Sequence, residues 1–132
     1  MVAPRILIVD DHHVFSEALE LVLGQRLLQE HAERAEFRRA ATAAEGLGLA
    51  RESGPFDVAI VDATLPDGDG VGVLVGIKAS HPRTRLALLI PDGDHPRTPE
   101  VGADEAIGKE SSFSELISRL ARLAGGGDRT TA

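Results

Sequence analysis

The sequence predicts an α/β domain built on a doubly wound, five-stranded parallel sheet with helices on both faces. Along its 132 residues, short apolar runs alternate with longer amphipathic stretches. Three of these runs are nearly continuous: residues 5–9 (RILIV), 58–61 (VAIV) and 86–90 (LALLI). Strands covered on both faces have this composition, and strands that alternate with helices are joined by crossovers that leave them parallel.

The remaining elements follow from local patterns. Apolar residues at 15, 18, 19, 22 and 23 recur at helical spacing after the first strand. Further along, we expect a weak strand over 37–41, helices over 43–51 and 71–79, and a short fifth strand over 106–108. Ser112 and Glu115 form a capping-box pattern at the start of a last helix. Residues 91–99 contain three prolines, so the helix after the fourth strand is predicted to be degenerate.

Length and composition indicate how many domains the chain forms and which kinds of protein it does not resemble. We expect one domain over residues 1–125, followed by a disordered tail or the start of a linker over 126–132. The absence of cysteine excludes disulfides and thiolate metal sites. A net charge of −7 argues against nucleic-acid binding by this chain, which would need clustered cations. The apolar runs are too short for a membrane span and no signal peptide is evident, so a cytoplasmic location is expected.

Charged residues follow the strands at the ends where ligands collect in such sheets. Asp10 and Asp11 follow the first strand, Asp62 the third and Lys109 the fifth. Clustered carboxylates stay ionised only beside a compensating cation, and Mg²⁺ prefers oxygen ligands. A carboxylate beside Mg²⁺ and a lysine is a good phosphoryl acceptor, because both cations neutralise charge on the transferred group. The third strand therefore delivers Asp62 to a charged pocket that suits phosphoryl acceptance.

These motifs together resemble the response-regulator receiver domains of two-component signalling. The resemblance rests on the acids in ILIVDDHH, the stretch VDATLPDGDG, the GAD at 102–104, the lysine in IGKE and the strand order. It implies a flavodoxin-like receiver fold and a signalling domain rather than an enzyme. The VDDHHVF opening and the GKESSFSELISRL ending most resemble the NarL-type branch, whose members often carry a DNA-binding output domain for transcription regulation.

The resemblance also implies a role for each site residue. Asp62 would accept a phosphoryl group from the phosphohistidine of a sensor histidine kinase or phosphotransfer protein. Asp11 and Asp62 would ligate Mg²⁺ directly, Asp10 would do so through water, and Thr64 would contribute its backbone carbonyl. Lys109 would contact the phosphoryl oxygens.

Two positions depart from the family pattern. The hydroxyl residue expected at the end of the fourth strand is Ile90, and the aromatic residue expected three positions before the lysine is Ala106. Two functions therefore stay open: a phosphoacceptor domain with a weakened or altered conformational switch, or a pseudo-receiver that binds a protein or ligand without phosphorylation. A Mg²⁺-dependent phosphatase fits poorly, because Thr64 stands where such enzymes need a second acid.

Other polar residues near the site have simpler interpretations. Residues 67–70 (DGDG) resemble the start of a calcium loop, but the acid expected near the loop's end is missing, so turn chemistry is favoured. His12 and His13 lack partners at helical metal-binding spacing, and we interpret them as surface or pocket-rim residues.

Overall fold

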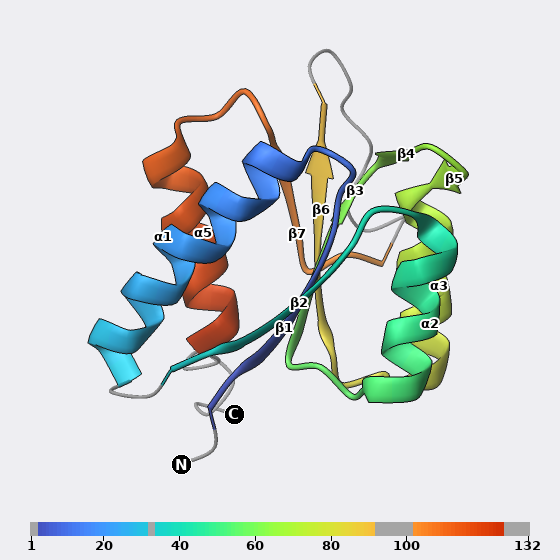
Figure 1. Cartoon of the computed structure of the whole chain (residues 1–132), viewed down its shortest axis with the longest axis horizontal. Coiled ribbons are helices and arrows are strands. Elements are labelled where there is room, and N and C mark those ends of the chain that lie inside the picture. The colour runs from blue at the N-terminus through green and yellow to red at the C-terminus, as the bar shows by residue number, and fades with distance from the viewer. Residues whose placement is uncertain (1–2, 32–33, 92–101, 126–132) are drawn as a thin grey trace.

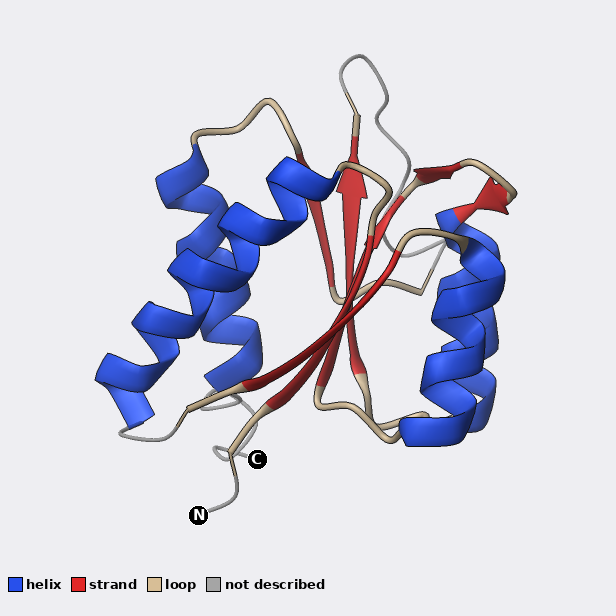
Figure 2. Ribbon diagram, viewed as in Figure 1, coloured by secondary structure: helices blue, strands red, loops and turns tan. Residues whose placement is uncertain are grey.

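The computed structural model describes residues 3–31, 34–91 and 102–125, and it has the predicted three-layer architecture (Figures 1 and 2). In chain order the elements are β1 (Arg5–Val9), α1 (His13–His31), β2 (Glu36–Ala40), α2 (Ala43–Ser53), β3 (Val58–Asp62), β4 (Thr64–Leu65), β5 (Gly68–Asp69), α3 (Gly70–Ser80), β6 (Arg85–Ile90), β7 (Glu105–Gly108) and α5 (Phe113–Gly125). The five longer strands form one parallel sheet in the order β2-β1-β3-β6-β7. The predicted fold class is confirmed.

Helices cover both faces of the sheet, with α1 and α5 on one side and α2 and α3 on the other (Figure 1). Successive residues of a strand point to opposite faces. Along β1, Ile6 and Ile8 therefore belong to the α1–α5 core, whereas Leu7 and Val9 belong to the α2–α3 core. All four are fully buried, which explains why this strand is apolar throughout.

Helix α3 forms although Gly72, Gly76 and its valines have low helix propensity. Asp69 caps its N-terminus by accepting a hydrogen bond from the Gly72 amide at 2.9 Å. Packing then outweighs propensity, because Val73, Leu74 and Ile77 are buried against the sheet.

Two local features near the site differ from the expected outline. Residues 64–69 form a short antiparallel hairpin, β4–β5, where only turn chemistry over 67–70 was predicted. Strand β3 extends one residue further than predicted, so Asp62 is its last residue. The predicted cap of the last helix is confirmed, since the Ser112 hydroxyl accepts from the Glu115 amide at 3.1 Å.

Two predictions fall outside the described residues. One is the degenerate fourth helix, which lies almost entirely within 92–101, and the other is the tail over 126–132. In the ranges that the structure describes, no helix has the length and apolar character needed to cross a bilayer.

Helix α2 contains two glycines that should respond oppositely to substitution. Gly48→Ala is expected to raise the free energy of unfolding by about 1 kcal/mol, because alanine favours the helix and its Cβ would meet no atom within 4 Å. Gly46→Ala is the matched control, since its Cβ would lie 2.8 Å from Val9 Cγ2 and force β1 and α2 apart. Urea denaturation measures both effects, and equal shifts in the two variants would contradict the packing argument.

Candidate functional site

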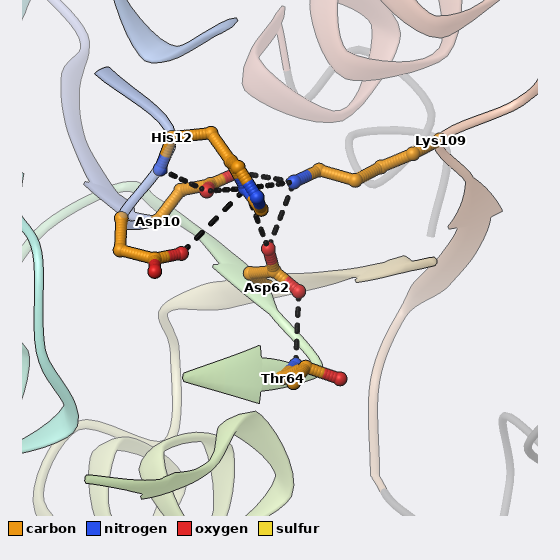
Figure 3. A network of polar contacts seen from close by, with 6 residues as sticks. Asp10, His12, Asp62, Thr64 and Lys109 are labelled. Atoms are coloured by element: carbon orange, nitrogen blue, oxygen red, sulfur yellow. Dashed lines mark hydrogen bonds and ion pairs between the residues drawn. The ribbon is translucent and has the colours of Figure 1, made fainter. Parts of the chain in front are cut away.

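The predicted site residues meet at the C-terminal edge of the sheet (Figure 3). β1 and β3 are neighbours with Val9 opposite Val61, so Asp10 and Asp62 follow on adjacent strands. Asp10 is 3% exposed and Asp62 only 1%. The Lys109 ammonium reaches both of them, with Nζ 2.8 Å from Asp10 Oδ2 and 2.8 Å from Asp62 Oδ2. The predicted convergence of carboxylates and lysine is confirmed.

Lys109 is held in place by the sheet and by one helix. Its backbone amide donates to the Ile90 carbonyl at 2.8 Å, which continues the β6–β7 ladder up to the lysine. Its Nζ lies 4.6 Å from the centroid of the Phe15 ring on α1, a cation–π contact that also shields the ammonium from water. Burial alone would lower the pKa of Lys109, but Asp10 and Asp62 outweigh it and raise the pKa. The lysine is therefore a fixed positive charge at neutral pH.

The Asp62 carboxylate has its two oxygens in different environments. Oδ1 accepts a hydrogen bond from the Thr64 backbone amide at 2.9 Å, and Oδ2 faces Lys109. These contacts orient the carboxylate at the end of a rigid strand. The structure thus shows a second use of Thr64, which anchors the acid through its amide, while the role of its carbonyl as a metal ligand stays a prediction.

The acids fit a divalent cation with oxygen ligands. Ligand atoms of Asp10, Asp11, His12 and Asp62 all lie within 4.8 Å of one another. Asp10 Oδ2 is buried and pairs with the Lys109 ammonium at 2.8 Å. Three carboxylates beside one ammonium leave negative charge uncompensated, and Mg²⁺ would neutralise it with the ligands that it prefers. The assignment of Asp11 and Asp62 as direct ligands, and of Asp10 as a ligand through water, stays a prediction.

Two residues have roles at or near the site that the sequence analysis did not assign. His12 extends over the acids, as the pocket-rim interpretation allowed, but its contacts with them were not foreseen (Figure 3). Asp67 accepts hydrogen bonds from the Ala43 and Ala44 amides at 2.7 and 3.0 Å, and these bonds lower its pKa. Asp67 thus fastens the loop after Asp62 to the start of α2. In the sequence, only the position of His12 next to Asp11 indicated that His12 could contact the acids. No feature of the sequence indicated that Asp67 would bond to α2.

The two departures from the family pattern lie on neighbouring strands. Ile90 is the last residue of β6 and is 6% exposed, within the α2–α3 core. Ala106 on β7 is half-buried and packs against the same core, opposite Leu88. Both side chains are apolar and belong to the hydrophobic packing.

Comparison with known proteins identifies the family. Residues 6–121 match the response regulator receiver domain, so the chain belongs to that family. Among curated proteins, it is 34% identical over 116 residues to a putative transcriptional regulator of Pseudomonas aeruginosa, covering 86% of this chain and 53% of that protein. It is 32% identical over 122 residues to the transcriptional regulatory protein PcoR of Escherichia coli, covering 90% of this chain and 50% of PcoR.

Solved structures agree on the fold. The non-phosphorylated HemR receiver domain of Leptospira biflexa is 31% identical, with a TM-score of 0.71 over 92% of this chain and 94% of that one. The BeF3-activated receiver domain of DrrB is 26% identical, with a TM-score of 0.69 over 92% of this chain and 97% of that one. A CheY-like receiver domain protein of Methanospirillum hungatei is 25% identical, with a TM-score of 0.76 over 98% of this chain and 99% of that one.

These relatives correct the predicted family branch, and their lengths show how much of each relative the chain matches. The predicted NarL-type branch is not supported, and DrrB of Thermotoga maritima, whose receiver domain this chain resembles, is an OmpR/PhoB homolog. The short motifs at the two ends of the domain therefore do not specify the branch. The chain spans about half the length, or less, of the curated relatives described above and of KdpE and PilR.

Proposed function

We propose that this domain accepts a phosphoryl group on Asp62 from the phosphohistidine of a partner histidine kinase or phosphotransfer protein. The observation that carries the proposal is the position of Asp62: a buried carboxylate at a strand end, 2.8 Å from Lys109 Nζ and beside the acids of β1. The proposed role is that of a cytoplasmic signalling domain, not an enzyme with a small-molecule substrate. An output domain that regulates transcription fits the curated relatives, which are transcriptional regulators longer than this chain.

The proposed transfer would use groups that lie close to Asp62. An Asp62 oxygen attacks phosphorus, the P–N bond to the kinase histidine breaks, and the imidazole leaves with the bonding electron pair, so that an aspartyl phosphate forms. The Thr64 amide holds the carboxylate in place, and Lys109 is positioned to neutralise charge on the phosphoryl oxygens. Asp10 and Asp11 would hold Mg²⁺, which supplies further charge neutralisation when it is bound.

The location of the adduct tests this proposal. The chain is incubated with Mg²⁺ and a small acyl-phosphate donor, or with a histidine kinase, and the product is trapped by reduction and mapped by mass spectrometry. We expect one modified residue, Asp62, because the Thr64 amide as well as Lys109 orients its carboxylate. Asp10 shares the burial and the contact with Lys109, but its proposed role is to hold Mg²⁺. An adduct on Asp67 or Asp69, or no adduct with any donor, would favour the pseudo-receiver alternative.

We further propose that the conformational response to phosphorylation is weak. A ligand shifts a conformational equilibrium only through its different interactions with the two states. Ile90 has no hydroxyl to donate to the phosphoryl group, which removes one charge-assisted hydrogen bond worth about 1.5–3 kcal/mol. That corresponds to a change of about tenfold or more in the population ratio. Ala106, likewise, has no ring that could move with such a hydroxyl.

Beryllofluoride, a mimic of the phosphoryl group, tests this weak response. The mimic is expected to perturb amide resonances around Asp62 in the wild type and to leave those of residues 102–120 nearly unmoved. The Ile90→Thr variant should show shifts across β7 and α5 under the same conditions. Large shifts over 102–120 in the wild type would contradict the proposal of a weak switch.

A further inference from the structure

The His12 imidazole lies within the acidic cluster of the site (Figure 3). Its Nδ1 is 3.0 Å from Asp10 Oδ1, 3.5 Å from Asp11 Oδ1 and 3.6 Å from Asp62 Oδ2. One nitrogen is therefore surrounded by three carboxylate oxygens from two neighbouring strand ends. The same nitrogen is 3.1 Å from Lys109 Nζ.

These contacts place opposite demands on one nitrogen. A carboxylate only accepts hydrogen bonds, so the contact with Asp10 requires a proton on Nδ1. The Lys109 ammonium only donates, so its contact requires a lone pair on the same atom. A cation bound between Nδ1 and the carboxylate oxygens would resolve this conflict, because it would accept the Nδ1 lone pair and the oxygens together as ligands.

The spacing suits ligands of a single ion. Two ligands at about 2.1 Å from a metal lie about 3.0 Å apart at an octahedral angle and about 3.4 Å apart at a tetrahedral angle. The separations from Nδ1 to the oxygens of Asp10, Asp11 and Asp62 run from 3.0 to 3.6 Å. The distances from Nδ1 to the three carboxylate oxygens are therefore close to those between ligands of one cation.

We propose that His12 Nδ1 is a metal ligand in this domain, and that it makes the site bind Co²⁺, Ni²⁺ and Zn²⁺ more tightly than Mg²⁺. Imidazole nitrogen is a favourable ligand for these transition metals, whereas Mg²⁺ prefers oxygen and keeps several waters. The inference rests on the proposed function, because it concerns the ion that the same acids hold. The His12 side chain is 64% exposed, so it closes the solvent side of the site while Asp10 and Asp62 form its buried side.

Co²⁺ and Mg²⁺ are the probes for the test. Each is titrated calorimetrically into the purified chain, and the ligand-field absorption of Co²⁺ reports nitrogen coordination. Loss of an outer-shell partner costs about 10- to 100-fold in metal affinity, so loss of a direct ligand should cost at least about tenfold. We expect His12→Ala to lose at least that much Co²⁺ affinity, with a changed Co²⁺ spectrum and an unchanged Mg²⁺ affinity.

His13→Ala is the matched control. It removes the same kind of side chain from the next residue, which is exposed at the start of α1 and lies outside the acidic cluster of the described structure. Its Co²⁺ affinity should equal that of the wild type. Equal Co²⁺ losses in the two variants, or parallel losses of Co²⁺ and Mg²⁺ in His12→Ala, would overturn the inference.

The phosphoryl-acceptor assay separates this inference from the proposed function. Modification of Asp62 in Mg²⁺, together with Co²⁺ binding that does not depend on His12, would reject the metal preference and leave the acceptor role in place. His12-dependent Co²⁺ binding in a chain that never accepts a phosphoryl group would confirm the ligand and reject the acceptor role.

Discussion

Replacement of Asp62 by Asn is expected to abolish phosphoryl acceptance and to remove most of the stabilisation that Mg²⁺ gives the folded domain. The amide has nearly the shape of the carboxylate, so it fits the 1% exposed position and can still accept from the Thr64 amide. It is a far weaker nucleophile, however, and it supplies no negative charge to a cation. A phosphotransfer assay and thermal unfolding with and without Mg²⁺ measure the two effects.

The size of the Mg²⁺ effect follows from linkage. At ten times its dissociation constant, an ion that binds only the folded state raises the free energy of unfolding by about 1.4 kcal/mol. Asp69→Asn is the matched control, because it makes the same chemical change outside the acidic cluster and asparagine caps helices as well as aspartate does. It should keep both the acceptor activity and the Mg²⁺ effect. If Asp62→Asn retains either one, the acceptor or the metal assignment fails.

Gly70→Ala is expected to destabilise the domain by about 3 kcal/mol, because the substitution overpacks backbone against backbone. A Cβ at this position would lie 2.1 Å from the Asp62 carbonyl oxygen and 2.8 Å from its carbonyl carbon. No side-chain rotation can relieve these contacts. The end of β3 or the start of α3 has to move, so the substitution also displaces the acceptor carboxylate.

Gly68→Ala separates this effect from a general loss of glycine flexibility. Gly68 lies two residues earlier, is exposed, and would present its Cβ to open space. Its substitution should change the free energy of unfolding by no more than about 0.5 kcal/mol. Urea denaturation measures the free energy of unfolding of both variants. If Gly70→Ala is as stable as Gly68→Ala, the backbone moves away from the new Cβ at no cost in stability, and the overpacking argument is wrong.

The parallel sheet and the meeting of Asp10, Asp62 and Lys109 could be predicted because they follow from the alternation of strands and helices, whereas the strand order came only from the resemblance to receiver domains. Apolar runs give the strands, and a parallel sheet brings the strand ends to one edge. Helix α3 was also predicted despite its glycines and valines, because its apolar spacing was correct. The bounds predicted for the strands of the large sheet and for α2 and α3 were accurate to within about two residues. Helix α1, in contrast, continues to His31, eight residues past the last apolar position from which it was predicted.

The contacts of single side chains could not be predicted in the same way. His12 points over the acids because of the backbone path between β1 and α1, which hydrophobic periodicity does not encode. Asp67 bonds to α2 because the β4–β5 hairpin brings the two segments together, and only tertiary structure determines that pairing. The prediction of the NarL-type branch is not supported for another reason: it rested on two short motifs at the ends of the domain, which do not specify the branch.

The sheet separates two hydrophobic clusters, one beneath α1 and α5 and the other beneath α2 and α3. Substitutions in α1 or α5 pack in a different cluster from those in α2 or α3, so their free-energy costs should add with little coupling. The two faces of the domain can evolve as independent modules, provided that the strand ends between them keep Asp62 in place.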